Sequence, residues 1–535
     1  MSAVLGVNAV FHDPAAALVV DGEVLAAAEE ERFSRRKHGH DNVPFAAWEL
    51  PTQSAVWCLA RAGLSPEDLD AVAYSYDPGL CPPYTSVVDD GWEGLRTLYA
   101  QRAPLFLRTA LPGLDPGSVR YVPHHLAHAA SAALAAPYPT SSVLVLDGRG
   151  ETASHLAGRC VDGDLDVLAA QQLPHSLGLL YEELTEHFGF RRSSDEYKVM
   201  ALASYGQPRW IKEFRELVRP TGDGGFTVEP VEWGSFSKPG EWDADLAATV
   251  QLRLEEVLLD LVRWLHGQTG DTALTMAGGV ALNCVANAKI AAEGPFEQVW
   301  VQPAAGDSGT ALGAAMHVAH ALGDPIAPMR TAALGRSWTD DELEAWLQTA
   351  GVPYDRPPDI AEEVAECLAH DGIVAWFQGR AEYGPRALGH RSLLAHPGFE
   401  KNLERMNDVK GREQFRPVAP MVLLERAHEI FTGTVPSPYM LFTHAVAPEW
   451  RSRIPVVTHV DGSARIQTVD RREEPLVARV LEGFARRTGL PVLVNTSLNT
   501  AGRPIVDDPR DALECFGSGP VDLLALGPFA VRRSR

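Results

Sequence analysis

Short apolar runs separated by turn residues recur along the first third of the chain. Residues 4–7 form one such run, and the longer apolar stretch after it divides at Asp21-Gly22, a dipeptide typical of tight hairpins. Residues 52–62 instead place apolar side chains at helical spacing, and Gly63 follows them as a helix-ending residue. The pattern predicts a strand, a hairpin and a helix, and therefore an α/β fold.

The same order returns further along the chain. "SSVLVLDGRG" is a strand-like run that ends in an aspartate turn, and "HLAGRCVDGDLDVLAA" divides at Asp162-Gly163 as a second hairpin would. Two strand–turn–helix patterns follow, "ALTMAGGVALNCVANAKIAA" and "QVWVQPAAGDSGTALGAAMHVAHAL". This recurrence predicts two similar half-domains. The pattern loosens over residues 325–338, so we expect one domain at 1–335 and a second, mixed α/β domain at 350–535.

Length and composition agree with this division and narrow the class of protein. A chain of 535 residues exceeds what one hydrophobic core usually supports. No apolar run approaches the roughly 20 residues of a membrane span, and the first residues lack the pattern of a signal peptide. The six cysteines form no close pairs, which favours a cytoplasmic protein. The net charge of −23 argues against nucleic acid or anionic lipid as a partner.

Histidines and aspartates at the ends of predicted elements suggest a metal site. His124 and His128 share one face of the helix predicted for "HHLAHAASAALAA", whereas His125 points about 100° away. Asp147 ends a strand, at the sheet edge where ligands bind in α/β folds, or else only fixes the next turn. Asp307 precedes a helix and is expected to cap it. A mixed nitrogen and oxygen ligand set suits Fe(II), Mn or Zn.

Two glycine turns between a strand and a helix are candidates for phosphate binding. They are "AGGVALN" (277–283) and "GDSGTALGAA" (306–315), and neither matches the common nucleotide motifs. Glycine turns of this kind often serve only packing. Together with "DGRGE" (147–151), however, they match the phosphate and adenosine elements of the superfamily of actin, heat-shock chaperones and sugar kinases.

The last third of the chain concentrates arginines within turns rich in glycine and proline, as in "QGRAEYGPRALGHRSLLAHP" and "KGREQFRPVAP". The guanidinium group suits phosphate or carboxylate, and glycine lets a small anion approach the backbone. "LVNTSLNTAGRPIV" adds a strand that ends in short polar side chains. We interpret this half as a pocket for a small anion. The alternative is surface pairing with nearby acidic residues, namely Glu382, Glu400, Glu404, Asp408 and Glu413.

Five of these segments, "FHDPAAALVVDGEVLAAAEEERFSRRKHG", "HHLAHAASA", "DGRGE", "GPRALGHRSLLA" and "NTSLNTAGRPIV", resemble the NodU/CmcH-type O-carbamoyltransferases, most nearly members that carbamoylate antibiotics. The likeness runs from about residue 4 to about residue 530. It implies an N-terminal Kae-like domain, of the actin and heat-shock-chaperone superfamily, and a C-terminal YrdC-like domain. It also implies that the YrdC-like domain cleaves carbamoyl phosphate and that ATP, with Mg, activates the carbamate as carbamoyl adenylate. The Kae-like domain then transfers the carbamoyl group to a hydroxyl at an Fe(II) site.

The resemblance assigns roles to individual residues. His12, as a neutral imidazole, is the candidate general base, and Lys37 lies near the reacting phosphates. The implied metal ligands are His124, His128, Asp147 and Asp307. The implied carbamoyl phosphate pocket is Arg386, Arg391, Lys410, Arg416, Arg465, Asn495 and Ser497. The implied nucleotide contacts are Gly278, Gly279, Asn283, Gly306, Ser308 and Gly309. The segment "KVMALA" departs from the family pattern, because Ala201 stands where glycine is usual.

Two other functions use related domains. One is synthesis of threonylcarbamoyladenosine in tRNA, which the strong negative charge opposes. The other is an ATP-switched binding protein of the heat-shock-chaperone type, which would need a peptide-binding module. For the carbamoyltransferase hypothesis the expected acceptor is a hydroxyl of a sugar, aminoglycoside, macrolide or similar small molecule. We expect its specificity to reside in loops such as 77–101 and 221–242.

Overall fold

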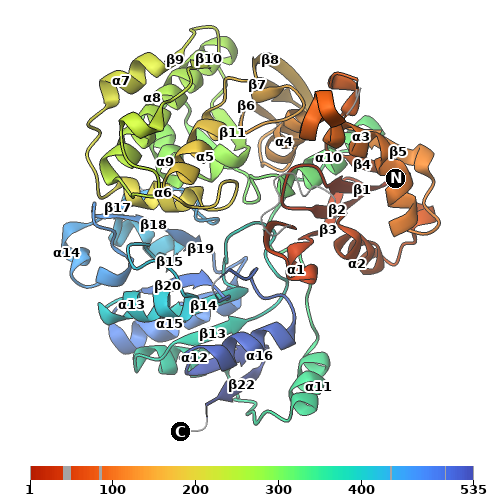
Figure 1. Cartoon of the computed structure of the whole chain (residues 1–535). Helices are drawn as coiled ribbons and strands as arrows, with labels where there is room; N and C mark the ends of the chain where they lie inside the picture. The colour runs from red at the N-terminus through yellow and green to blue at the C-terminus, as the bar shows by residue number, and fades with distance from the viewer. Residues whose placement is uncertain (1, 40–49, 84–86, 434–435, 501, 534–535) are drawn as a thin grey trace. The chain divides into compact units, whose positions relative to one another are not determined.

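The computed structural model describes residues 2–39, 50–83, 87–433, 436–500 and 502–533 (Figure 1). It divides into two compact units, Met1–Arg330 and Thr331–Arg535. Helix α11 (Asp340–Ala350), which falls between the two expected domains, belongs to the second unit. Of the expected specificity loops, residues 84–86 lie outside the described part of the chain.

The first sheet of unit 1 has the strand order β3-β2-β1-β4-β5. Strand β1 pairs antiparallel with β2 and parallel with β4. The predicted hairpin turn is confirmed between β2 and β3, where Asp21 and Gly22 have φ values of 54° and 79°. The strands are β1 (Ala3–Asn8), β2 (Ala15–Val20), β3 (Glu23–Glu29), β4 (Ala71–Tyr74) and β5 (Val119–Tyr121).

The second sheet of unit 1 repeats this topology, with the order β12-β11-β6-β7-β8. Strand β6 pairs antiparallel with β7 and parallel with β11, as β1 does with β2 and β4. The predicted duplication into two similar halves is therefore confirmed. The strands are β6 (Thr140–Leu146), β7 (Ala153–Val161), β8 (Asp164–Gln172), β11 (Ala273–Ala277) and β12 (Gln298–Val301), with a separate pair, β9 (Val218–Pro220) and β10 (Phe226–Val228).

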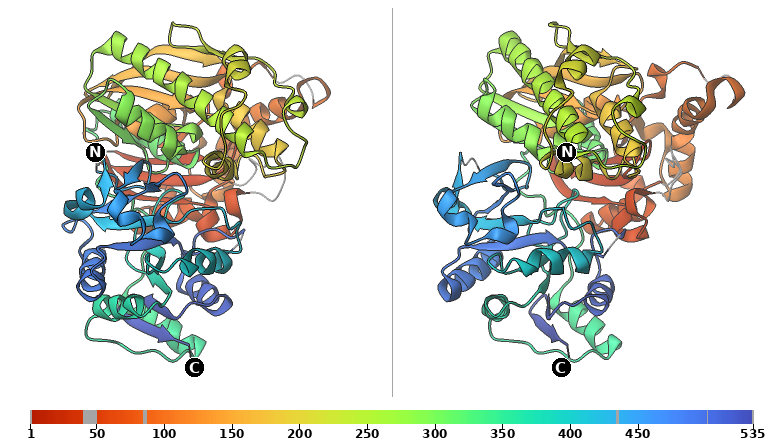
Figure 2. Two further views of the ribbon diagram at one scale, coloured as in Figure 1. Left: turned by 90° about the vertical axis from the view of Figure 1, so that its left-hand side faces the viewer. Right: turned by 60° about the vertical axis from the view of Figure 1, so that its left-hand side comes forward.

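Two helices in equivalent positions of the halves pack against each other. Helix α4 (His124–Ala133) follows β5, and α10 (Ser308–Ala321) follows β12 (Figure 1). Figure 2 shows the ribbon from two further sides. A Cβ atom on Gly313 would lie 1.9 Å from the carbonyl oxygen of Ala127, and one on Gly6 would lie 1.8 Å from that of Ala311. Only glycine allows these close approaches. They bring the start of α4 and the start of α10 beside the end of β6.

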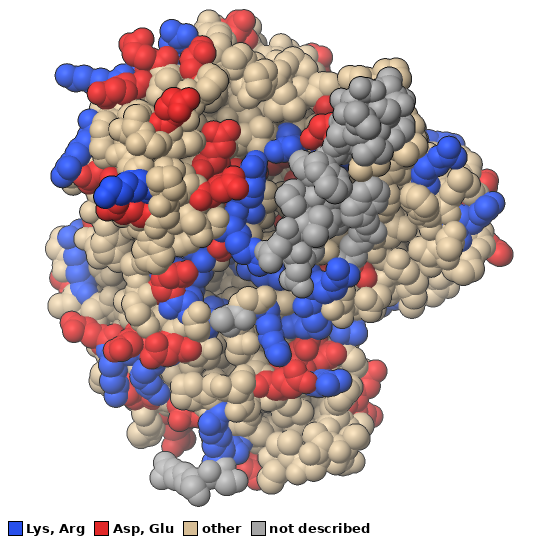
Figure 3. All heavy atoms as spheres, viewed as in Figure 1, with Lys and Arg blue, Asp and Glu red and all other residues tan. Residues whose placement is uncertain are grey.

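Eight further α-helices lie in the described residues of unit 1. They are α1 (Glu31–Ser34), α2 (Thr52–Ala62), α3 (Val87–Ala110), α5 (Leu177–His187), α6 (Glu196–Ala203), α7 (Ile211–Leu217), α8 (Ala244–Thr269) and α9 (Cys284–Glu293). Helix α2 ends at Gly63 in the left-handed conformation, as predicted. No helix of the described chain is both long and apolar enough to cross a membrane. Figure 3 shows basic side chains interspersed with acidic ones over the face that it draws.

Unit 2 is also α/β, as predicted. Its main sheet has the order β19-β15-β20-β14-β13-β21-β22, and a three-stranded sheet has the order β16-β17-β18. The strands are β13 (Val374–Phe377), β14 (Arg391–Ala395), β15 (Ala419–Leu423), β16 (Phe431–Thr432), β17 (Thr443–Val446), β18 (Ser463–Arg465), β19 (Gln467–Val469), β20 (Val492–Ser497), β21 (Leu523–Leu526) and β22 (Phe529–Arg532). The other helices are α12 (Ile360–Ala369), α13 (Lys401–Lys410), α14 (Pro448–Arg451), α15 (Pro475–Thr488) and α16 (Pro509–Ser518).

Candidate functional site

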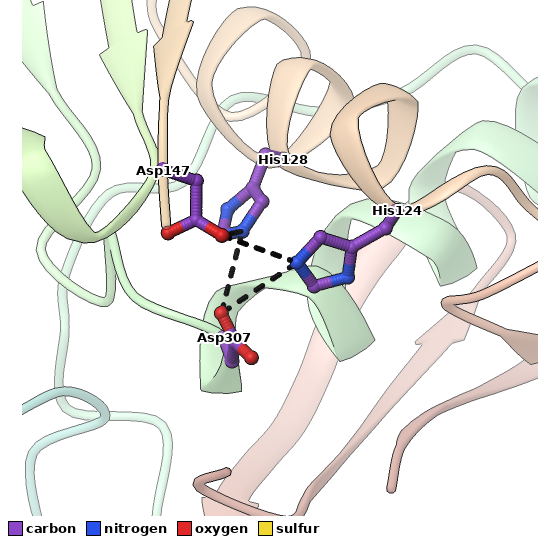
Figure 4. A group of neighbouring side chains, drawn as sticks. All are labelled: His124, His128, Asp147 and Asp307. Carbon is purple, nitrogen blue, oxygen red and sulfur yellow. Dashed lines mark ion pairs between the residues drawn. The ribbon is translucent and has the colours of Figure 1, made fainter. Parts of the chain in front are cut away.

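Four buried side chains converge where the two halves of unit 1 meet (Figure 4). His124 and His128 come from the first turns of α4, Asp147 directly follows β6, and Asp307 directly precedes α10. Their ligand atoms all lie within 4.8 Å of one another. The structure thus brings together the four residues expected as metal ligands, and places two helix N-termini, with their partial positive charge, beside the carboxylates.

The spacing of these four groups suits one shared metal ion. His124 Nε2 lies 3.5 Å from Asp147 Oδ2 and 3.6 Å from Asp307 Oδ1. His128 Nε2 lies 3.9 and 3.6 Å from the same two oxygens. Two donors that each lie about 2.1 Å from one tetrahedral ion would be about 3.4 Å apart. The observed separations are close to that value.

The hydrogen bonding of these groups leaves room for a cation. Within the described chain, Nε2 of both histidines and both carboxylate oxygens of Asp307 are buried without a hydrogen-bond partner. Buried polar atoms are rarely left so, because desolvation without a partner is costly. Two imidazoles and two carboxylates form the mixed set that Fe(II), Mn or Zn accepts. The residues therefore fit a divalent metal, although they do not distinguish among these three.

Several backbone groups and one further carboxylate orient the ligands. His124 Nδ1 lies 3.2 Å from the carbonyl oxygen of Ser75, which turns its Nε2 toward the aspartates. The Glu151 carboxylate accepts hydrogen bonds from the backbone N–H of His124 at 2.9 Å and of Asp77 at 2.7 Å. Glu151 ends the "DGRGE" segment. No sequence pattern indicates this role, because its partners lie 27 and 74 residues away.

The charge of His124 and the charges of Asp147 and Asp307 stabilise one another. Burial lowers the pKa of His124, but the carboxylates of Asp307 and Asp147 outweigh it and raise that pKa to about 10. Burial raises the pKa of Asp307, yet the positive charges of His12 and His124 outweigh this and hold it well below its usual value. Without a metal ion, His124 is therefore protonated and faces ionised carboxylates. A divalent ion would displace this proton on binding.

His125 stands apart from the ligand group, as its direction on the helix predicts. Burial and the positive charge of His124 lower its pKa to about 3. A Cβ atom on Gly150 would lie 2.6 Å from its Nδ1, so the ring packs against that glycine. His125 therefore serves as a neutral packing residue beside the site.

His12 lies at the edge of the ligand group, but not as the neutral imidazole that was expected. Its Nδ1 lies 2.9 Å from Asp13 Oδ2, and its Nε2 lies 3.8 Å from Asp307 Oδ2. Burial lowers its pKa, but the carboxylates of Asp307 and Asp13 outweigh it and hold the pKa well above the usual value. Sequence spacing did not reveal these two carboxylates, and the general-base role of His12 stays a prediction. A cation bound to Asp307 would weaken this pull.

Lys37 is not joined to the ligand group by any contact that the described residues make. It lies half-buried in η1 (Lys37–Gly39), and its neighbour His38 instead approaches the site through Asp13, with Nδ1 2.7 Å from Asp13 Oδ1. The assignment of Lys37 to reacting phosphates stays a prediction.

Asp307 does not cap its helix through its side chain, contrary to expectation. Its own backbone is already helical and its carboxylate makes no capping hydrogen bond, because that carboxylate faces the histidines instead. Asp147 does more than fix a turn. Its Oδ1 accepts the N–H of Gly279 at 2.8 Å while its Oδ2 faces His124.

The glycine turns serve packing more than was expected. A Cβ on Gly278 would lie 2.1 Å from the carbonyl oxygen of Leu146, and one on Gly309 would lie 2.0 Å from that of Ala304. The N–H of Gly279, expected for nucleotide, is given to Asp147. Two further residues expected to contact the nucleotide, Gly306 and Ser308, lie buried at the start of α10, where phosphate binding stays a prediction.

Asn283, also expected to contact the nucleotide, forms hydrogen bonds within unit 1. Its side chain caps α9 by accepting the N–H of Ala286 at 3.1 Å, and its Nδ2 donates to Gln251 Oε1 at 2.8 Å. A role in nucleotide contact would add to these bonds.

Glu196 is an acidic residue near the site that sequence reasoning missed. Its Oε1 is buried without a hydrogen-bond partner in the described chain, and it interacts electrostatically with Glu182 and His12. Burial and then Glu182 raise its pKa to about 7. The pKa of Glu196 is thus higher in the folded chain than in the unfolded chain, where a glutamate has a pKa near 4.3. Such a group stabilises the folded protein most at a pH below that unfolded value, and this stabilisation is lost as the pH rises to about 7.

Replacing Glu196 with glutamine is therefore expected to stabilise the protein at high pH. We expect the free energy of unfolding to rise by about 2 kcal/mol at pH 8 and by little at pH 5, because only the charged carboxylate carries the desolvation cost. Urea titrations at the two pH values measure this. Glu213→Gln, an exposed position on α7, should show no pH-dependent gain; an equal gain there would assign the effect to net charge.

In unit 2, one residue predicted for the anion pocket, Lys410 at the end of α13, is a buried lysine that reaches the end of β20. Lys410 is 7% exposed, and its Nζ donates to the carbonyl oxygen of Ser497 at 2.6 Å, to Ser497 Oγ at 2.8 Å and to Asn499 Oδ1. The strand-end polar residues expected to hold a ligand thus hold the ammonium group in place. Its charge remains there to attract an anion.

A chain of hydrogen bonds connects the expected pocket residues. Asn495, two residues before Ser497 on β20, donates from Nδ2 to the carbonyl oxygen of Ala387 at 3.1 Å and to Gln467 Oε1 at 2.7 Å. Ala387 is adjacent to Arg386, and Gln467 begins the strand that follows Arg465. Asn495 is therefore a connecting group rather than a free ligand donor. The half-buried Arg386 precedes Ala387 directly, and the half-buried Arg465 lies two residues before Gln467.

Arg391 has a different role from the one expected. It is fully buried, and its two terminal nitrogens donate to the carbonyl oxygens of Gln378, Gly379 and Arg336. Its guanidinium carbon lies 3.7 Å from the centre of the Phe377 ring. We therefore assign Arg391 to holding the loop, not to the anion. Arg416 is half-buried and pairs with Glu413 at 3.3 Å, as the surface-pairing alternative anticipated.

Comparison with known proteins places this geometry in a family. The family model "Carbamoyltransferase N-terminus" matches residues 3–81, 108–236 and 231–316, and "Carbamoyltransferase C-terminus" matches residues 365–533. Nodulation protein NolNO of Sinorhizobium fredii is 36% identical over 98% of this chain and 80% of its own length. Nodulation protein U of Rhizobium tropici is 31% identical over 94% of this chain and 92% of its own.

Similarity to solved structures is lower. HypF of T. kodakarensis aligns with 61% of this chain and 49% of its own length at 15% identity, with a TM-score of 0.39. The two family models together cover most of the chain, and the NolNO relative exceeds 30% identity over nearly all of it. The chain belongs to the carbamoyltransferase family and is a carbamoyltransferase.

Proposed function

We propose that this carbamoyltransferase uses ATP and carbamoyl phosphate to carbamoylate a hydroxyl group of a small-molecule natural product, as in the biosynthesis or tailoring of antibiotics. The observation that carries the proposal is the buried group of His124, His128, Asp147 and Asp307 with its unpartnered donor atoms. Family membership supports carbamoyl transfer, and the site supports a metal-assisted transfer to an oxygen nucleophile.

The proposed reaction has three steps. Carbamoyl phosphate is hydrolysed to carbamate and phosphate in unit 2. Carbamate oxygen then attacks the α-phosphorus of ATP, forming carbamoyl adenylate and releasing pyrophosphate. Finally, the acceptor hydroxyl attacks the carbamoyl carbon and AMP leaves. Carbamate is a poor electrophile, and adenylation gives it a good leaving group.

In unit 1, His124, His128, Asp147 and Asp307 would hold Fe(II), with Mn or Zn as alternatives. When bound, the metal supplies Lewis acidity toward an oxygen of the acceptor or of the carbamoyl group, without redox chemistry. His12, whose Nε2 faces Asp307, is placed to accept the hydroxyl proton once its own proton is lost. Its Nδ1 contact with Asp13 keeps the ring oriented for this.

In unit 2, Arg386, Lys410 and Arg465 would bind the phosphate of carbamoyl phosphate. Arginine supplies paired N–H donors and lysine a point charge, which together suit a dianion. The buried position of Lys410 strengthens its attraction, because little water screens it.

The proposal is tested by supplying ATP, Fe(II), Mg and ¹⁴C-labelled carbamoyl phosphate with kanamycin, erythromycin and methyl glucoside as probes of the aminoglycoside, macrolide and sugar classes. We expect label in at least one probe, dependent on ATP, with one AMP formed for each carbamoyl group. Transfer that proceeds equally without ATP would overturn the adenylate route.

A further inference from the structure

The loop 383–391 in unit 2 is the glycine-rich turn that the sequence suggested as an anion-binding backbone. It carries Arg386, and its last residue, Arg391, begins β14. In the structure, however, side chains of unit 2 already occupy both its N–H and its C=O groups. The contacts of one acidic residue, Glu382, decide what the loop can do.

The Glu382 carboxylate fills the place that an external anion would take. Glu382 is 1% exposed, and its Oε1 accepts the backbone N–H groups of Leu388 at 2.6 Å, His390 at 3.0 Å and Arg391 at 3.2 Å. Successive N–H groups that converge on one point are a typical anion-binding arrangement. Because Glu382 takes these three donors, they are not available to a ligand. The sequence predicts that a small anion approaches this backbone, and for these three N–H groups that prediction is wrong.

Three carbonyl oxygens of the loop also accept hydrogen bonds from side chains of unit 2. Gln467 Nε2 donates to the carbonyl oxygen of Leu388 at 2.7 Å, and Trp376 Nε1 donates to that of Gly389 at 2.7 Å. Asn495 holds the next carbonyl, that of Ala387. These contacts come from three different strands or their ends, so the loop conformation is fixed by the sheet around it. Arg386 stands immediately before this fixed segment.

We propose that Glu382 is a positioning residue: its carboxylate fixes the loop and thereby sets the direction in which Arg386 meets a phosphate-bearing ligand. The inference rests on the proposed carbamoyl phosphate pocket and adds a residue to it. The ligand's phosphate is then met by cationic side chains, with Glu382 acting through the loop and not touching the ligand.

The proposal predicts an effect opposite in sign to simple electrostatics. Removing a negative charge near a phosphate pocket should, by Coulomb's law alone, tighten phosphate binding. Replacing Glu382 with glutamine also replaces three charge-assisted hydrogen bonds with weaker neutral ones, which loosens the loop. If Glu382 positions Arg386, binding must weaken in spite of the lost repulsion.

The experiment is titration calorimetry of the full chain with inorganic phosphate, at a temperature well below the unfolding transition of each variant. We expect Glu382→Gln to raise the Kd for phosphate about tenfold. The control is Glu474→Gln, which removes a carboxylate whose one side-chain contact among the described residues is with His390, at 3.1 Å. The Kd of this control should stay unchanged or fall slightly. The KM for carbamoyl phosphate should follow the Kd in both variants.

A second variant addresses the case in which Glu382→Gln does not fold. Gln467→Met removes the hydrogen bond to Leu388 and the acceptor for Asn495 Nδ2 without changing the charge, and we expect about a threefold rise in Kd. Unchanged or tighter phosphate binding by Glu382→Gln, or by Gln467→Met where the first variant does not fold, would overturn the positioning role while leaving the pocket intact. Absence of phosphate binding by the unaltered protein would overturn the pocket, and with it this inference.

Discussion

Replacing Asp307 with alanine is expected to abolish carbamoyl transfer while hydrolysis of carbamoyl phosphate continues. Asp307 contributes the oxygen that lies 3.6 Å from Nε2 of both His124 and His128, so its loss removes the group that both histidines face. We expect transfer to fall at least a thousandfold, because a mixed site that loses one of four ligands binds its metal far more weakly. The residue belongs to unit 1, and the proposed hydrolysis uses residues of unit 2 only.

Metal content read by atomic emission provides a second measure that does not depend on activity. The unaltered protein, loaded anaerobically with Fe(II), should hold about one ion per chain, and Asp307→Ala close to none. The control is Asp164→Ala, which removes a carboxylate that is 93% exposed on β8 and should change neither value. Full metal occupancy and normal transfer in Asp307→Ala would show that the four residues are not the metal site.

Replacing Arg386 with alanine is expected to stop the first step instead. The side chain would supply paired donors to the phosphate of carbamoyl phosphate, and loss of such a charge-assisted contact in a partly buried pocket costs on the order of a hundredfold in rate. Phosphate release from carbamoyl phosphate, followed without ATP or acceptor, measures this step. The metal content of unit 1 should stay unchanged.

Arg510 offers the matched control for Arg386. It is 70% exposed on α16 and pairs with Glu514 at 2.9 Å. Arg510→Ala removes the same charge from the same unit and should leave phosphate release within about twofold of the unaltered rate. If Arg386→Ala releases phosphate as fast as Arg510→Ala does, the anion pocket lies elsewhere.

The features that could be predicted from the sequence depend on local chemistry. The Asp21-Gly22 hairpin and the end of α2 at Gly63 follow from backbone preferences of those residues. The shared face of His124 and His128 follows from helix periodicity, and the duplicated halves follow from repetition of the strand and turn pattern. These features needed no knowledge of how distant segments meet.

The features that could not be predicted depend on distant segments. Glu151 holds the N–H of His124, and Asp147 takes the N–H of Gly279, because the fold brings residues 27 and 132 positions apart together. Glu382 was read as a surface partner for arginines, yet it is buried against the backbone of its own loop. Sequence patterns show residue types, but not which hydrogen bonds those residues have already used.

The proposed function depends on activation of carbamate with ATP before transfer. The decisive experiment is mass spectrometry of a reaction that contains the unaltered protein, ATP, Mg, Fe(II) and carbamoyl phosphate, but no acceptor. We expect carbamoyl adenylate and released pyrophosphate, both lost in Arg386→Ala. Cleavage of carbamoyl phosphate with no adenylate and no pyrophosphate, while a supplied acceptor is still carbamoylated, would contradict it.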